Sequence, residues 1–135
     1  MSDLKVGKDM ILDHNSPKPI YVQIAEWLET EIINENIGEH EKMYSQYQLA
    51  DKFNVNPATA AKGLTLLLEA DILYKKRGLG MFVNEQAKEK IIEKRKNENL
   101  KSIINNLVRE AEYLKVSNEE LFKLIEKVRY EGRES

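Results

Sequence analysis

The chain has 135 residues, no cysteine and a formal net charge of −2, and its length allows one domain or a small domain with an appendage, since domains usually run to about 100–200 residues. The lack of cysteine excludes disulfides, thiolate nucleophiles and cysteine-ligated metal sites. No apolar stretch approaches the ~20 residues of a membrane-spanning helix, and no apolar signal-peptide core follows Met1, so we expect a cytoplasmic protein with no membrane partner.

Residues 1–18 are mixed and polar, and two closely spaced prolines, Pro17 and Pro19, predict an extended arm that leads into the first domain. Residues 19–36 then predict a helix, because one face is apolar at helical spacing, with Ile20, Ile24, Leu28 and Ile32. Tyr21 and Trp27 could be partly exposed, but aromatic residues at helical spacing usually belong to a core. Residues 39–43 predict a short strand.

Residues 45–69 predict two short helices joined by a tight turn. Ser45 can cap the first helix while Gln48 reaches back, which is the capping-box pattern. Asn56 can cap the second helix, with Pro57 at the first position, where its missing N–H costs nothing. One face of the second helix is apolar and the start of the other face carries Ala58, Thr59, Ala61 and Lys62. This is the pattern of a helix-turn-helix, whose second helix offers its N-terminal residues to the major groove.

A small basic hairpin follows, with strands at residues 72–74 and 81–83 around the turn KKRGLG. Its three cations suit phosphates or a minor groove, and its two glycines permit positive φ and a close backbone approach. A solvated turn in a small α+β domain is the alternative, but the ordered set of motifs favours DNA binding. The expected fold class is therefore mainly α with a small β-hairpin wing (α+β), with a winged helix-turn-helix over residues 19–84.

Four segments together resemble the GntR family of bacterial transcription regulators: PIYVQIA at residues 19–25, LA at 49–50, VNPATA at 55–60 and GLGMFV at 78–83. The short chain and the KKRG wing resemble the YtrA subfamily. The resemblance implies a DNA-binding regulator, most often a repressor, of an operon that frequently contains ABC transporter genes. Many members carry arginine where this chain has Tyr47, Pro57 and Ala61, so base reading here is expected to depend more on DNA shape and apolar contacts.

We expect DNA contacts from the start of each helix and from the wing: Ser45, Gln46, Tyr47, Ala58, Thr59, Lys62, Lys76, Arg77, Gly78 and Gly80. Tyr47 either bonds a phosphate or simply packs, and we favour the DNA contact. The acidic net charge requires a local patch, and residues 52–80 provide one, with five cations against two carboxylates.

Residues 85–135 predict a two-helix segment for dimerisation or effector binding, in which Ser117 opens the last helix. The two helices carry more apolar side chains than they could bury against each other. We therefore expect a homodimer interface formed by Ile103, Ile104, Leu107, Val108, Ala111, Leu114, Leu121, Leu124, Ile125 and Val128. The alternative is a hairpin folded back onto its own winged helix. A twofold dimer would match a palindromic operator, while a pocket for a small-molecule effector, whose identity is unknown, could form only at the interface.

Other functions are weaker expectations. A winged helix used for protein contact would bind no specific DNA, and an architectural module would bind DNA without operator specificity. An enzyme is not expected, because two distant histidines and no cysteine leave no recognisable catalytic set. We likewise expect no cofactor and no metal. The expected function is a sequence-specific homodimeric repressor.

Overall fold

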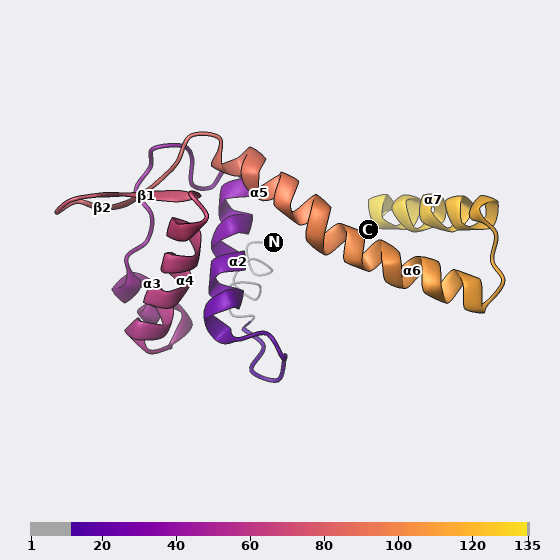
Figure 1. The fold of residues 1–135 in the computed structure, drawn as a ribbon, viewed down its shortest axis with the longest axis horizontal. Helices are drawn as coiled ribbons and strands as arrows, with labels where there is room; N and C mark the ends of the chain where they lie inside the picture. The colour runs from indigo at the N-terminus through magenta and orange to yellow at the C-terminus, as the bar shows by residue number, and fades with distance from the viewer. Residues whose placement is uncertain (1–11, 135) are drawn as a thin grey trace. The chain divides into compact units, whose positions relative to one another are not determined.

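The structure is a computed structural model that describes residues 12–134, so most of the predicted N-terminal arm lies outside the described residues. With the labels of Figure 1, the elements are α2 (Ile20–Ile33), α3 (Gln46–Phe53), α4 (Pro57–Glu69), β1 (Leu73–Lys76), β2 (Gly80–Val83), α5 (Ala87–Arg95), the π-helical turn η1 (Lys96–Leu100), α6 (Lys101–Tyr113) and α7 (Asn118–Glu134). This mainly helical fold with one hairpin confirms the predicted fold class. The chain forms two compact units, Met1–Glu93 and Lys94–Ser135, and the predicted boundaries after residues 18 and 84 stay predictions.

Helix α2 is shorter than the sequence predicts, because it ends at Ile33 instead of residue 36. Its apolar face is the expected one, with Ile24, Leu28 and Ile32 buried. Ile37, which follows the helix, is also buried. The chain therefore leaves the helix before residue 36 and turns back toward the core. The turn that brings Ile37 inward places Glu35 in the left-handed region at φ 62°.

The helix-turn-helix is built by local caps, as the sequence predicts. The Ser45 hydroxyl oxygen accepts a hydrogen bond from the Gln48 N–H at 3.1 Å, and the Gln48 side chain accepts one from the Ser45 N–H at 2.8 Å. Asn54 turns the chain at φ 55°, a conformation that asparagine tolerates better than most residues. The Asn56 side chain then caps α4. These bonds fix where α3 begins and ends and where α4 begins.

Helix α4 packs on both α2 and α3, and the apolar side chains of the three helices fill one core. The predicted inner face of α4 is confirmed, since Ala60, Leu64 and Leu67 are buried. Helix α5 starts in the same unit, where Ala87 and Ile91 are buried in this core. The core therefore leaves the opposite face of α4 uncovered.

Gly63 sets how closely α4 lies on α2. A Cβ at this position would stand 2.9 Å from the Tyr21 carbonyl oxygen, a distance that real Cβ atoms essentially never show. The obstructing atom belongs to the backbone, so it cannot rotate away. Glycine inside a helix costs roughly 0.8–1.0 kcal/mol relative to alanine. The close crossing of the two helices gives a physical reason for accepting that cost.

Strands β1 and β2 pair antiparallel along their whole length. The predicted third strand over residues 39–43 is wrong: within the described residues the sheet has two strands, and this segment adds one isolated bridge, between Lys42 and Phe82. Its backbone still follows β2, since the Met43 N–H donates to the Met81 carbonyl oxygen at 2.8 Å. His40 stands at φ 66°, which interrupts the extended backbone that a strand needs.

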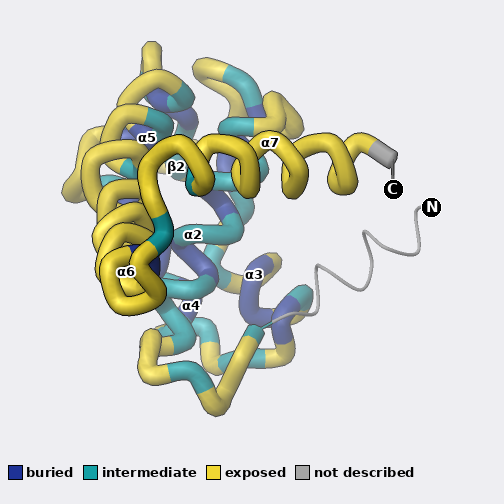
Figure 2. The backbone as a smooth tube through the Cα atoms, turned by 90° about the vertical axis from the view of Figure 1, so that its right-hand side faces the viewer, coloured by how far each residue is buried: buried dark blue, intermediate teal, exposed yellow. Residues whose placement is uncertain are grey.

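From Ala87 to Tyr113 the chain is helical throughout, through α5, η1 and α6. The Ser117 hydroxyl oxygen then caps α7 by accepting the Glu120 N–H at 3.2 Å. Figure 2 shows α7 almost entirely exposed, and Leu121 is its one half-buried residue among residues 118–133. Between residues 94 and 133 only Ala111 is buried. None of the helices in the described part of the chain combines the length and the apolar character needed to cross a membrane.

We expect Gly63→Ala to lower the free energy of unfolding by about 1 kcal/mol, because overpacking at ~1–3 kcal/mol outweighs a helix-propensity gain of roughly 0.8–1.0 kcal/mol. Urea unfolding followed by far-ultraviolet circular dichroism measures this change. Gly132→Ala in α7 is the matched control, since a Cβ there meets nothing within 4 Å. The control should be as stable as the parent or slightly more so. Equal stability of Gly63→Ala and the parent would contradict the steric explanation.

Candidate nucleic-acid interface

The start of α4 presents a small surface that faces away from the core. Ala58 and Lys62 are exposed and Thr59 is half-buried, because Ala60 and Leu64 occupy the inner face. All of α4 lies in the described part of the chain, and Lys62 is its single cation. The free N–H groups of a helix N-terminus favour anions. This surface can therefore offer a methyl group, a hydroxyl and an ammonium to DNA.

A shallow groove of about 500 Å³ lies beside this surface, between α2, α3 and α4. It brings together three of the predicted contacts, Gln46, Ala58 and Lys62, with Tyr21 of α2. The Lys62 ammonium lies 4.8 Å from the centre of the Tyr21 ring, within the range of a cation–π interaction. The sequence pattern favoured a core position for Tyr21 and left partial exposure open; Tyr21 is half-buried and lines this groove. Periodicity within α2 carried no signal for a contact with another helix.

Ser45 and Tyr47 flank Gln46 at the start of α3. The Ser45 oxygen accepts the capping bond, which leaves its hydroxyl proton available to a phosphate. Tyr47 is 69% exposed, so the alternative that it simply packs in the core of this chain is not supported. Both hydroxyls can donate to a phosphate, and their contact with DNA stays a prediction.

The tip of the wing forms a second cationic surface. Lys75, Lys76, Arg77, Gly78 and Gly80 line an open cavity of about 450 Å³, and all five are exposed. The two glycines stand at φ 77° and 113°, where a side chain would be strained. The predicted wing contacts therefore lie together.

Lys42 is a wing cation that the sequence analysis did not assign. A Cβ on Gly80 would stand 3.1 Å from Cε of Lys42, so the lysine side chain lies against the wing. The Lys76 ammonium lies 4.7 Å from the centre of the Phe82 ring. The sequence could have placed Lys42 on the wing, because Lys42 lies in the predicted strand at residues 39–43 and any segment paired with β2 brings its side chains to the wing.

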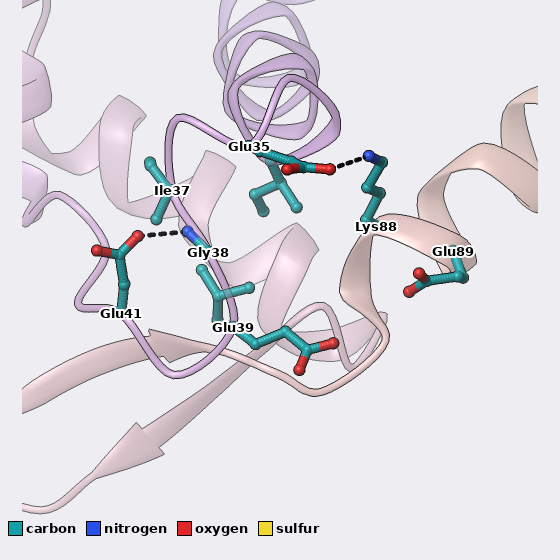
Figure 3. A pocket seen from close by; sticks show the side chains of 9 residues that line it. Glu35, Ile37, Gly38, Glu39, Glu41, Lys88 and Glu89 are labelled. Atoms are coloured by element: carbon teal, nitrogen blue, oxygen red, sulfur yellow. Dashed lines mark hydrogen bonds and ion pairs between the residues drawn. The ribbon is translucent and has the colours of Figure 1, made fainter.

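A different cavity, of about 410 Å³, lies at the end of α2 and is acidic (Figure 3). Its charged lining consists of Glu35, Glu39, Glu41, Glu89 and Lys88. Lys88 donates a hydrogen bond to Glu35, and this bond and the lysine charge hold the pKa of Glu35 below its ordinary value. Four carboxylates against one ammonium repel phosphates, so this cavity is not part of the nucleic-acid surface. Among the described residues, no cluster of histidine and carboxylate side chains could hold a metal ion.

Comparison with known proteins identifies the family. No protein-family model matches the chain. The solved structure of a GntR family transcriptional regulator from Listeria monocytogenes is 31% identical, with a TM-score of 0.70, and the match covers 86% of this chain and 98% of that one. This chain belongs to the GntR family. The GntR assignment confirms the resemblance seen in the sequence.

Other relatives agree with this assignment. The repressor YtrA of Bacillus subtilis is 28% identical over 117 residues, which are 87% of this chain and 89% of YtrA. The repressor NagR of the same organism is 31% identical over 84 residues, or 62% of this chain, but the match spans only 35% of NagR. The structure of S. agalactiae BusR in complex with its busAB-promotor DNA is 32% identical, with a TM-score of 0.51, over 84% of this chain and 56% of BusR.

GntR membership fixes the class of function. The chain is a DNA-binding transcription regulator with a winged helix-turn-helix, similar to YtrA, and it is not an enzyme. The wing is strongly cationic, and the groove at α4 carries one cation, Lys62, and one carboxylate, Glu69. These surfaces suit this function better than the cavity at the end of α2, which four carboxylates line.

We expect the double variant Lys76→Ala/Arg77→Ala to weaken binding to all DNA sequences and to reduce the slope of log K against log salt by about 2, since each lost phosphate contact removes ~1 from that slope. Fluorescence anisotropy over a salt series measures both effects. Lys123→Ala/Lys127→Ala in α7 removes the same charge and serves as the control. Equal losses in the two variants would mean that net charge, not the wing, causes the effect.

Proposed function

We propose that this GntR regulator is a homodimeric repressor that blocks transcription by occupying a palindromic operator. The observation that carries the proposal is the uncovered start of α4 in the same unit as a cationic wing. Two relatives that match this chain, YtrA and NagR, are named as repressors. BusR, another match, has been solved on its promoter DNA. The half-sites would lie about one helical turn, ~34 Å, apart.

The proposed contacts fall into those that bind the DNA backbone and those that face the bases. Ser45, Gln46 and Tyr47 bind phosphates and orient the unit on the duplex. Ala58, Thr59 and Lys62 face the base edges of the major groove. The wing, through Lys76, Arg77 and the Gly78 and Gly80 backbone, binds the adjacent backbone or minor groove. With no arginine in α4, DNA shape contributes much of the discrimination among sequences.

The proposed dimer interface is the apolar face of the second unit. Ile103, Ile104, Leu107 and Val108 are between 38% and 62% exposed. Leu114, Leu124, Ile125 and Val128 are exposed as well. Leu121 is half-buried and Ala111 is buried within the chain, so these two residues add little uncovered area. Phe122 and Tyr130, which the sequence analysis did not include, are also exposed apolar residues of α7. Apolar area of this extent favours a second copy as its cover.

The regulated operon is proposed to contain ABC transporter genes, as the resemblance to the YtrA subfamily implies. This part of the proposal rests on that resemblance alone. If the C-terminal segment binds a small-molecule effector, the pocket would lie between the helices of the two copies, because two helices alone are too few to enclose the ~300 Å³ or more that a drug-sized ligand requires.

We expect the protein to bind DNA from upstream of its own gene at least tenfold more tightly than scrambled DNA. Regulators typically bind their specific sites with an affinity roughly 10³–10⁷ times that for nonspecific DNA. Fluorescence anisotropy at physiological salt, followed by footprinting, measures the preference and the size of the site. Equal, weak and steeply salt-dependent binding to both DNAs would instead favour an architectural module. No binding even at low salt would favour a role in protein contact.

We expect Leu107→Glu to shift the protein from dimer to monomer. Each copy loses the burial of one leucine, worth ~1.5–3 kcal/mol, so the twofold interface loses about twice that and the dissociation constant rises by two orders of magnitude or more. Sedimentation equilibrium measures this change. Ser102→Glu is the matched control, because residue 102 lies on the opposite side of α6 from Leu107 by helical spacing. A monomeric parent protein, or a dimer unaffected by Leu107→Glu, would contradict the proposed interface.

A further inference from the structure

Lys62 carries all the positive charge that α4 itself can bring to DNA. A lysine is a point charge on a flexible four-carbon stem, so fixing it at one base or phosphate costs side-chain entropy. Arginine would lose less freedom for each hydrogen bond, but α4 contains none. A contact that restricts Lys62 before DNA arrives would therefore strengthen binding.

The structure contains such a contact. The Lys62 ammonium lies 4.8 Å from the centre of the Tyr21 ring. Tyr21 belongs to α2 and is half-buried, whereas Lys62 is exposed. The ring is therefore less accessible than the ammonium, which stays open to a ligand.

The neighbouring residue explains why the ring can reach Lys62. Gly63 lets the α4 backbone approach the Tyr21 backbone so closely that a Cβ would stand 2.9 Å from the Tyr21 carbonyl oxygen. The next residue inward on α2, Ile24, would be 3.4 Å from the same Cβ. The α4 backbone therefore lies close to the α2 backbone at the residue next to Lys62, beside the backbone of Tyr21 itself.

The groove around this pair is open and lies on the proposed DNA surface. Gln46 of α3 and Ala58 of α4 line it together with Tyr21 and Lys62. Gln46 and Ala58 are themselves proposed contacts, to phosphate and to a base.

We propose that Tyr21 is a positioning residue that holds the Lys62 ammonium ready for DNA through a cation–π contact. The inference rests on the proposed function, in which the start of α4 faces the operator. The ring restricts the rotamers of Lys62 and leaves its N–H donors free, since the contact uses the charge and not a hydrogen bond. Tyr21 acts through Lys62, and the hydroxyl group of Tyr21 is not required.

The first test needs no DNA and begins with the parent protein. The ring current of Tyr21 should shift the Lys62 side-chain methylene protons upfield in the NMR spectrum of the free parent protein. Tyr21→Phe should keep this shift and Tyr21→Leu should abolish it. Lys75, which lies on the wing, provides the reference lysine. Unshifted Lys62 methylene protons in the parent protein would overturn the proposal.

The second test is a double-mutant cycle of operator binding by fluorescence anisotropy, using the promoter fragment of the chain's own gene. Tyr21→Leu should weaken binding about two- to fivefold, the range expected from an exposed cation–π contact. Tyr21→Phe should bind like the parent. In a Lys62→Met background, Tyr21→Leu should cause no further loss. Thermal melting of each variant checks that the fold is retained.

The outcomes separate the inference from the function on which it depends. A parent protein that prefers its promoter, together with a Tyr21→Leu variant that binds equally well or more tightly, overturns the positioning role alone. The same loss from Tyr21→Leu with and without Lys62 would assign Tyr21 a purely structural role and also overturns it. A parent protein without any promoter preference refutes the proposed operator function, and the inference then falls with it.

Discussion

The close crossing of α2 and α4 at Gly63 is the constraint on which the DNA-binding unit depends. It lets Ile24 and Leu28 of α2 share a core with Leu64 and Leu67 of α4. Because that face of α4 is committed to the core, the face that bears Ala58 and Lys62 is left to solvent. Gly63 thus links packing to the proposed function. The inner face of α4 packs on the core, and its outer face is the surface proposed to contact DNA.

Charge is distributed so that an acidic chain can still bind a polyanion. The formal net charge is −2, yet the wing gathers Lys75, Lys76 and Arg77, and Lys42 lies against it. Four carboxylates of the same unit line a different cavity, at the end of α2. Affinity for phosphate is then a property of one surface and not of the whole molecule.

The sequence predicted most of the fold, because its strongest signals are local. Ser45 and Asn56 define helix starts through side-chain bonds that span two or three residues, and both caps form as expected. The wrong third strand shows the limit of such reasoning. The left-handed backbone at His40 depends on how the chain turns between α2 and the wing, and the local amino-acid composition does not predict it. For the candidate site, the residues at the start of α4 and in the wing follow from motif spacing. The contact between Tyr21 and Lys62, 41 positions apart, depends on how two helices cross and could not be read from the periodicity of either.

The second unit adds a thermodynamic consequence to this arrangement. Its helices bury little on their own, since between residues 94 and 133 only Ala111 is buried. In the proposed dimer, covering this apolar face stabilises the C-terminal helices and joins two winged helices that each have few cations for DNA. A single winged helix with such a small cationic surface would bind weakly, whereas two linked copies gain affinity from the high effective concentration of the second site. Operator binding and dimer formation then reinforce each other by linkage, because DNA that binds the dimer preferentially also shifts the equilibrium toward it. The lack of arginine in α4 and the uncovered apolar face are therefore connected. In the proposed dimer, the affinity that α4 does not gain from arginine contacts comes from the simultaneous binding of two symmetric copies.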